Sequence, residues 1–142
     1  MSTDSWTWSL DRLIPSDVTA GCQLLAEVLD QMRATDWQQH DVFSVHLALE
    51  EALVNAIKHG NRGDLSKKVR VVCRLSQERI WIEITDEGGG FDPDEVPDPT
   101  DEARLECPNG RGIMLMRCYM SRVEYNAAGN RVVMEKVREN AS

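Results

Sequence analysis

Two stretches of the chain carry apolar residues three and four positions apart, the spacing that is typical of amphipathic helices. Ser16 is expected to cap the first helix, because it follows Pro15 and precedes an apolar stripe. That stripe consists of Val18, Cys22, Leu25, Leu29 and Met32. The second helical region starts at Thr35-Asp36, and its main body is expected from about His40 to His59. Its stripe consists of Val42, Val45, Leu49, Leu53, Ala56 and Ile57.

The second helix is expected to end at Gly60, in the left-handed backbone conformation that closes many helices. Shorter runs elsewhere have the alternation or the β-rich composition of strands. Residues 6–13 alternate and are expected to form an edge strand, and residues 113–120 look helical. Two hairpins are expected, one from residues 69–75 and 79–85 and the other from residues 122–126 and 131–137.

This order of elements predicts an α+β two-layer sandwich, with helices packed on one face of a mixed, mostly antiparallel sheet. The chain has 142 residues, so a single domain over residues 1–142 is expected, long enough to bury a core. A hydrophobic share of 42% and a charged share of 28% are those of an ordinary globular protein.

Charge and cysteine usage narrow the function classes. A net charge of -8 argues against direct binding of nucleic acid. It would suit a basic protein partner, although an acidic surface more often serves solubility. Residues 1–9 lack the basic start and apolar core of a secretory signal, and no apolar run is long enough to span a membrane. The four cysteines lie far apart and are expected to be free thiols, which favours a cytoplasmic protein.

The second helix carries the first chemically suggestive pair. Glu51 and Asn55 project only about 40° apart on an ideal helix, and His59 continues their row. Glu50 points about 140° away from Asn55 and is not expected to join them. An amide oxygen suits Mg²⁺, and a carboxylate beside it can accept a proton from a hydroxyl or water. Taken alone, the row fits an ordinary solvated helix face better.

The second pattern is an acid followed by a glycine cluster at the end of an expected strand. Asp86 can accept a hydrogen bond from an exocyclic amine, which adenine has and guanine lacks at the matching position. Gly88 and Gly90 have no Cβ, so the backbone can approach a ligand closely. A surface turn explains this segment about equally well, because Asp and Gly dominate turns.

The third pattern is a pair of glycines, Gly110 and Gly112, at the start of the expected helix near residue 113. Unpaired backbone N–H groups at such a start attract phosphate, and glycines let it come near. Arg111 either adds a positive charge or points to solvent. The segment is neither a Walker A loop nor a protein-kinase glycine loop, and a lone Gly-x-Gly is a weak signal.

In this order, the three patterns resemble the N, G1 and G2 boxes of the GHKL ATPase superfamily. Among its members the chain is most similar to the bacterial anti-sigma factor serine/threonine-protein kinases. The resemblance runs from about Ile14 to Val137, and residues 50–60 are its most specific segment.

The resemblance assigns roles by position. It implies Glu51 as the general base, Asn55 as the Mg²⁺ ligand and Asp86 as the residue that reads adenine. Residues 93–109 would form an ATP lid, which is rich in acidic residues. The nucleotide-binding set that we predict comprises Asn55, His59, Asp86, Gly88, Gly90, Gly110, Arg111 and Gly112.

The resemblance also implies a function: an ATP·Mg²⁺-dependent serine/threonine kinase that acts as an anti-sigma factor. Its partners would be a sigma factor and an anti-sigma-factor antagonist, which it would phosphorylate to regulate transcription by partner switching. The related kinases are commonly dimers, so a homodimer is compatible with the resemblance.

Histidine kinases usually carry Asn where this chain has Glu51. A serine hydroxyl or water must lose a proton when it attacks, whereas a neutral imidazole need not, so Glu51 favours a hydroxyl or water acceptor.

Two other functions remain open at this point. The chain can be a nucleotide-gated binding module without kinase activity, in which ATP only stabilises one partner-binding form. It can also be a stand-alone ATPase domain, although the transducer and dimerisation domains of the chaperones are missing. The sequence does not separate kinase from binding module, because binding and catalysis would use nearly the same residues.

Overall fold

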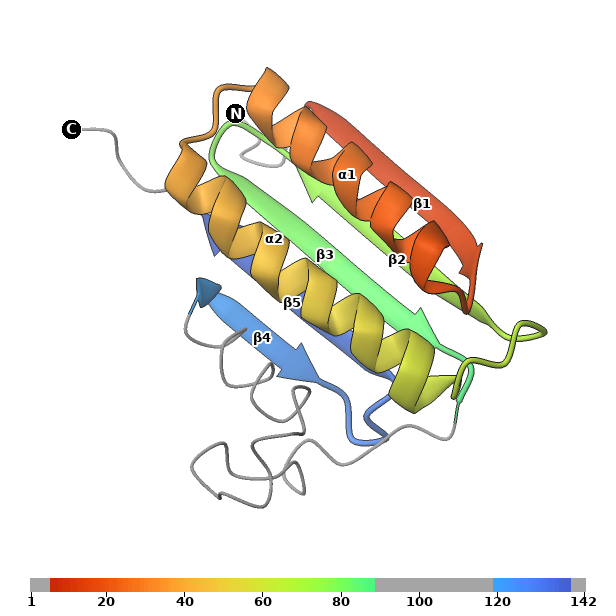
Figure 1. The fold of residues 1–142 in the computed structure, drawn as a ribbon. Coiled ribbons are helices and arrows are strands. Elements are labelled where there is room, and N and C mark those ends of the chain that lie inside the picture. The colour runs from red at the N-terminus through yellow and green to blue at the C-terminus, as the bar shows by residue number, and fades with distance from the viewer. Residues whose placement is uncertain (1–5, 89–118, 139–142) are drawn as a thin grey trace, which may run out of the picture.

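The chain folds into two layers, with helices on one face of a five-stranded sheet (Figure 1). The structure is a computed structural model, which describes residues 6–88 and 119–138. The predicted two-layer sandwich is confirmed. The sheet was expected to be mixed and mostly antiparallel. In the described part of the chain all neighbouring strands are antiparallel.

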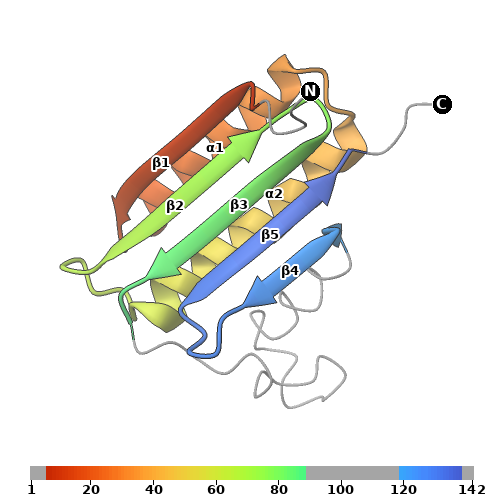
Figure 2. The same ribbon diagram turned by 180° about the vertical axis from the view of Figure 1, so that it is seen from behind.

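The strands follow the predicted hairpins closely. They are β1 (Trp8–Pro15), β2 (Lys68–Leu75), β3 (Arg79–Asp86), β4 (Arg122–Tyr125) and β5 (Arg131–Val137), in the sheet order β1-β2-β3-β5-β4. β1 is an edge strand, as its alternation predicted, and both hairpins are confirmed. Figure 2 shows the face of the sheet that is turned away from α1 and α2. That face carries ion pairs such as Asp11–Arg70 and Arg79–Glu135.

The register of the strands brings three distant segments together at one end of the sheet. Asp86, the last residue of β3, pairs with Val69 near the start of β2. The Asp86 backbone N–H donates to the Asn130 carbonyl, 2.9 Å away, in the turn between β4 and β5. The residue expected to read adenine therefore lies where both hairpins meet.

Helix α1 (Val18–Ala34) begins one residue later than its predicted cap implies. Asp17 is the cap, and its carboxylate accepts a hydrogen bond from the Thr19 backbone N–H. Ser16 is instead buried, and its hydroxyl donates to the Lys67 carbonyl at 2.7 Å. The prediction of Ser16 as cap was wrong because a buried long-range partner binds its hydroxyl, and the neighbouring acid satisfies the helix start.

Helix α2 (Gln39–Val54) continues into a π-helical segment, η1 (Asn55–Gly60). All six residues of its predicted apolar stripe are buried. In α1 the stripe was only partly right: Leu25, Leu29 and Met32 are buried, whereas Val18 and Cys22 are exposed. Both helices contribute to one buried core that also contains Ile80 and Ile82 of β3.

Gly60 does not adopt the left-handed conformation that its position after a helix predicted. The positive φ angles in this loop belong to Arg62, at 54°, and Gly63, at 69°. The expected turn therefore lies two to three residues further along the chain. Gly60 is glycine for a different reason, its contact with Asp86, which concerns the site.

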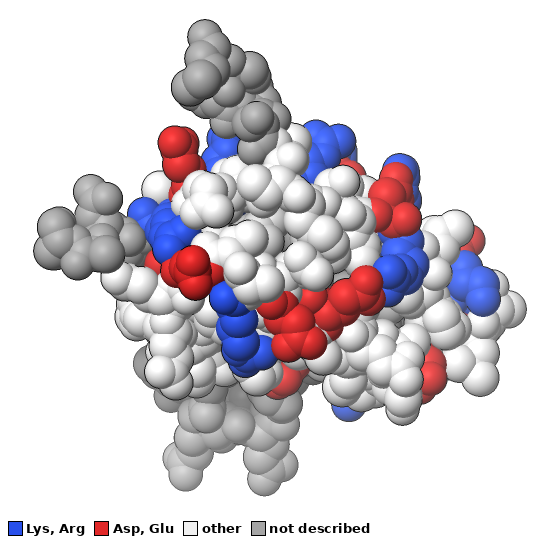
Figure 3. All heavy atoms as spheres, turned by 90° about the horizontal axis from the view of Figure 1, so that it is seen from above, with Lys and Arg blue, Asp and Glu red and all other residues white. Residues whose placement is uncertain are grey.

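Two surface features bear on partners. Figure 3 views the molecule from above and shows acidic and basic side chains next to one another around a largely uncharged centre. In the described part of the chain, no helix is both long enough and apolar enough to cross a membrane.

Candidate functional site

Two residues of the predicted nucleotide site share one narrow cavity. Asn55, at the start of η1, and Asp86, at the end of β3, both line it. The turn between β4 and β5 supplies Gly129 and Asn130, and β4 supplies Tyr125. Asp86 lies about 30 positions after Asn55 in the sequence, and Tyr125 lies about 70 positions after it. The fold brings all three residues to the same end of α2.

Asn55 is buried, with only 2% of its surface exposed. Its Nδ2 donates to the Tyr125 hydroxyl, 3.3 Å away. With Nδ2 engaged in this bond, Oδ1 is the end of the amide left to accept a ligand. Tyr125 was missed in the sequence, where nothing local links it to a residue 70 positions earlier.

Asn55 also lies where α2 changes into a π-helix. Such local widening of a helix is rare and is frequent at functional sites. The widening alters the face on which later residues project. His59, predicted to continue the row of Glu51 and Asn55, is exposed, whereas Asn55 is buried.

Glu51 is partly buried, one turn before Asn55. Its Oε1 is shielded from solvent and has no hydrogen-bond partner within the described residues. Burial, and secondarily the charge of Glu50, raises the Glu51 pKa to about 7, while Lys58 opposes the shift. A carboxylate with a pKa near 7 is suited to take a proton at neutral pH.

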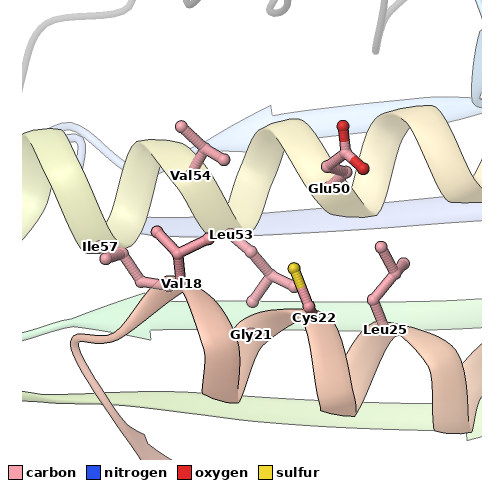
Figure 4. A pocket seen from close by; sticks show the side chains of 8 residues that line it. All are labelled: Val18, Gly21, Cys22, Leu25, Glu50, Leu53, Val54 and Ile57. Atoms are coloured by element: carbon pink, nitrogen blue, oxygen red, sulfur yellow. The ribbon is translucent and has the colours of Figure 1, made fainter.

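Glu50 lies on another side of α2, as the helical spacing indicated. Its carboxylate is 3.3 Å from His46 Nε2, and both side chains are exposed. Glu50 also lines an apolar hollow of about 180 Å³ between α1 and the helix formed by α2 and η1 (Figure 4). Four of the other residues there are Val18, Leu25, Leu53 and Ile57. None of the predicted site residues lines this hollow.

Asp86 is almost fully buried, at 6% exposure. Burial raises the pKa of its carboxyl group, while a hydrogen bond from the Gly88 N–H and the charge of Lys67 act in the opposite direction. The Gly88 N–H donates to Asp86 Oδ1 at 2.9 Å. The carboxyl group is thus held in a tight turn, with little freedom to reorient.

Gly60, Asp86 and Gly88 pack so closely that no side chain fits between them. A Cβ on Gly60 would lie 2.3 Å from the Asp86 carboxyl carbon, and a Cβ on Gly88 would lie 1.7 Å from the Gly60 carbonyl oxygen. Both distances are far below van der Waals contact. Gly88 was expected to allow close approach of a ligand; in the structure it allows the close approach of the protein's own backbone.

We expect Gly60→Ala to displace Asp86 and to weaken nucleotide binding. Overpacking of this kind costs about 1–3 kcal/mol, which corresponds to a roughly 5- to 150-fold loss of ATP affinity if the cost falls on the nucleotide-bound form. Titration calorimetry with ATP·Mg²⁺ measures the loss of affinity. Gly63→Ala is the matched control, because its Cβ would meet nothing within 4 Å although its φ of 69° makes it strained. Equal losses of affinity in both variants would contradict the packing argument.

The remaining predicted site residues lie outside the described part of the chain. They are Gly90, Gly110, Arg111 and Gly112, together with the expected lid over residues 93–109 and most of the helix expected at 113–120. Cys107 and Cys118 lie there too. Cys22 and Cys73 are described, and both are free thiols as predicted.

Comparison with known proteins identifies relatives of the whole fold. Residues 14–136 match the family of histidine kinase-like ATPase domains. An anti-sigma F factor from Oceanobacillus iheyensis is 33% identical over 102 residues, which cover 68% of this chain and 69% of that protein. An anti-sigma F factor from Clostridium perfringens is 29% identical over 102 residues, with similar coverage of 68% and 72%.

Two further relatives are matched over smaller shares of their length. The serine/threonine-protein kinase BtrW from Bordetella bronchiseptica is 27% identical over 91 residues, which cover 63% of this chain and 64% of that protein. A crystal structure of RsbU and RsbW domains from Mycobacterium tuberculosis aligns with a TM-score of 0.62 at 14% identity. It covers 95% of this chain but only 34% of the longer chain, and it shows that the fold is the same.

Proposed function

The chain belongs to the family of histidine kinase-like ATPase domains, on the branch of the anti-sigma factor kinases, and we propose that it is a serine/threonine-protein kinase. ATP binding is implied by the family. The observation that carries the proposal is Glu51, a partly buried carboxylate with a pKa of about 7, one turn before Asn55. One of its oxygens has no hydrogen-bond partner among the residues that the structure describes.

In the proposed reaction, the hydroxyl oxygen of a serine or threonine forms a bond to the γ-phosphorus of ATP. The bond between that phosphorus and the oxygen bridging to the β-phosphate breaks, so the products are a phosphorylated hydroxyl and ADP. Glu51 accepts the proton that the hydroxyl loses. Its partial burial raises the affinity of the carboxylate for that proton.

The side chains around the cavity have the chemistry that a nucleotide and a magnesium ion need. Asn55 has its amide nitrogen engaged with Tyr125, which leaves an amide oxygen, a ligand type that Mg²⁺ prefers. When bound, the ion would neutralise phosphate charge there. Asp86 would accept from the exocyclic amine of adenine. His59, Gly88, Gly90, Gly110, Arg111 and Gly112 keep their predicted nucleotide-binding roles in the proposal.

The proposed biological role is that of an anti-sigma factor. Relatives with 27 to 33% identity are named anti-sigma F factor or serine/threonine-protein kinase, which supports this role in general. We propose a sigma factor as the protein bound and an antagonist protein as the phosphoryl acceptor. Residues 1–142 would act as one domain, which binds neither nucleic acid nor membrane directly.

Transfer of labelled phosphate tests the proposal. Partners captured from a lysate, with and without Mg²⁺·ATP, are incubated with ATP labelled in the γ-phosphate, and phosphoserine or phosphothreonine is mapped on whatever binds. We expect label on a captured protein and none when ATP is labelled in the α-phosphate. Partner binding that depends on ATP, without any transfer of label, would instead identify a nucleotide-gated binding module. Steady phosphate release without an acceptor would identify a stand-alone ATPase.

A further inference from the structure

Asn61 makes a buried hydrogen-bond network that no local pattern in the sequence predicts. It directly follows η1, and none of its surface is exposed. Its Nδ2 donates to Ser16 Oγ at 2.8 Å and to the Lys68 carbonyl at 2.9 Å. Its Oδ1 accepts from the Glu87 backbone N–H at 2.8 Å. Both N–H groups and the carbonyl oxygen of the amide are therefore engaged.

The network joins four separate parts of the chain at the nucleotide end of the fold. They are the residue before the cap of α1, the residue after η1, the start of β2 and the turn after β3. Because the amide is fully buried, each lost bond would leave a polar group unsatisfied in a low-dielectric interior. A saturated network of this kind holds its members in one arrangement.

Glu87 is the residue on which this rigidity acts. It lies between Asp86 and Gly88. The N–H group that donates a hydrogen bond to Asn61 Oδ1 therefore belongs to the peptide group directly after Asp86. The Glu87 carboxylate accepts from the Lys68 backbone N–H, which ties the same turn to β2 a second time. The direction of the Asp86 carboxyl group thus depends on a turn whose backbone Asn61 anchors from behind.

We propose that Asn61 is a positioning residue for adenine recognition. By binding the Glu87 N–H, it holds the Asp86–Gly88 turn in the orientation in which Asp86 accepts a hydrogen bond from the exocyclic amine. This inference rests on the proposed function, which assigns Asp86 to the adenine base. A purely structural role of Asn61 would affect only the stability of the protein. A positioning role would also change which nucleotide base the protein prefers.

The test compares the affinities for ATP and inosine triphosphate, in which a carbonyl oxygen replaces the exocyclic amine. Both dissociation constants are measured by calorimetry with Mg²⁺ present, at a temperature at which circular dichroism shows each variant folded. We expect the wild-type protein to prefer ATP. Asn61→Ala is expected to reduce that preference roughly tenfold, as loss of a well-aimed hydrogen bond to a charged group would. Asp86→Asn gives the ratio of the two affinities that is expected when the hydrogen-bond acceptor itself is altered.

Ser16→Ala is the matched control. It removes a hydroxyl from the same buried network, but it leaves the Asn61 bond to Glu87 in place, so the preference for ATP should persist. If Asn61→Ala does not fold, Asn61→Ser serves as the second variant, because its side chain is too short to reach the Glu87 N–H. The ratio of two affinities on one variant does not change with the fraction of active protein.

The outcomes separate the two proposals. A wild-type protein that binds neither nucleotide, or binds both equally, would overturn the assignment of Asp86 to adenine and this inference with it. A wild-type preference that survives in Asn61→Ala would overturn the role of Asn61 alone and leave the kinase proposal intact. Loss of the preference in Asn61→Ala and its retention in Ser16→Ala would support the positioning role.

Discussion

Glu51→Gln is expected to lower the rate of phosphoryl transfer by about 10²–10⁴-fold, the usual contribution of a general base. ATP affinity should change little, because the carboxylate acts on the acceptor hydroxyl and not on the nucleotide. Gln is nearly isosteric with Glu, so the effect reports the lost base and not a cavity. Transfer rates at saturating ATP and dissociation constants from calorimetry measure the two quantities separately.

The pH profile gives the same prediction a second readout. The base is active when ionised, and the pKa of Glu51 is about 7. The transfer rate should therefore rise about tenfold per pH unit below pH 7 and level off above it. Glu50→Gln is the control: it should keep the transfer rate but move the inflection to lower pH, because the charge of Glu50 helps to raise the Glu51 pKa. Undiminished transfer in Glu51→Gln would show that another group is the base.

The same pKa shift has a consequence for stability, and its sign is opposite to that of most carboxylates. The pKa of Glu51 lies above its ordinary value of 4.5, so the folded protein keeps a proton that the unfolded chain releases between about pH 4.5 and pH 7. The free energy of unfolding therefore falls as the pH rises through that window. Glu51→Gln should lack this fall and be more stable at pH 8 by about 1–3 kcal/mol, a range reduced for the partial exposure of the side chain.

The features that were predicted correctly depend on short-range periodicity. The stripe of α2 that includes Val45 and Leu49 repeats at helical spacing, and it is buried against the sheet. The separation of Glu50 from Glu51 follows from the same spacing. Strands in neighbouring hairpins were found because alternation and the turns between them are local signals. The antiparallel sheet then follows from short connections.

The features that were missed depend on contacts between distant residues. Ser16 was assigned to a helix cap, but residues 61 and 67 bind its hydroxyl. Gly60 was assigned to a turn, but its missing Cβ makes room for Asp86, 26 positions later. A single sequence shows no such pairing. The π-helix at Asn55 is similar: the sequence predicts a helix there, while its wider turn depends on the surrounding packing.

A buried ion pair carries the largest expected effect on stability. Asp41, in the first turn of α2, is fully buried, and its Oδ1 is 3.8 Å from Lys136 Nζ on β5. Lys136 is 8% exposed, and its Nζ also donates to the Tyr119 carbonyl at 3.0 Å. Tyr119 lies three residues before β4. The pair thus connects the helix layer, the sheet and the chain that leads into β4.

Lys136→Met is expected to lower the free energy of unfolding by about 3–5 kcal/mol, because it removes the ammonium group of a buried ion pair with Asp41. Urea unfolding at pH 7 measures the change. Lys68→Met is the control, since Lys68 is exposed on β2 and a surface change of this kind stays within about 0.5 kcal/mol. Asp41→Asn combined with Lys136→Met removes both charges, so the double variant should be less destabilised than the sum of the single variants. Strict additivity would mean that the two charges do not interact, and that the loss in Lys136→Met reflects only its bond to Tyr119 and its packing.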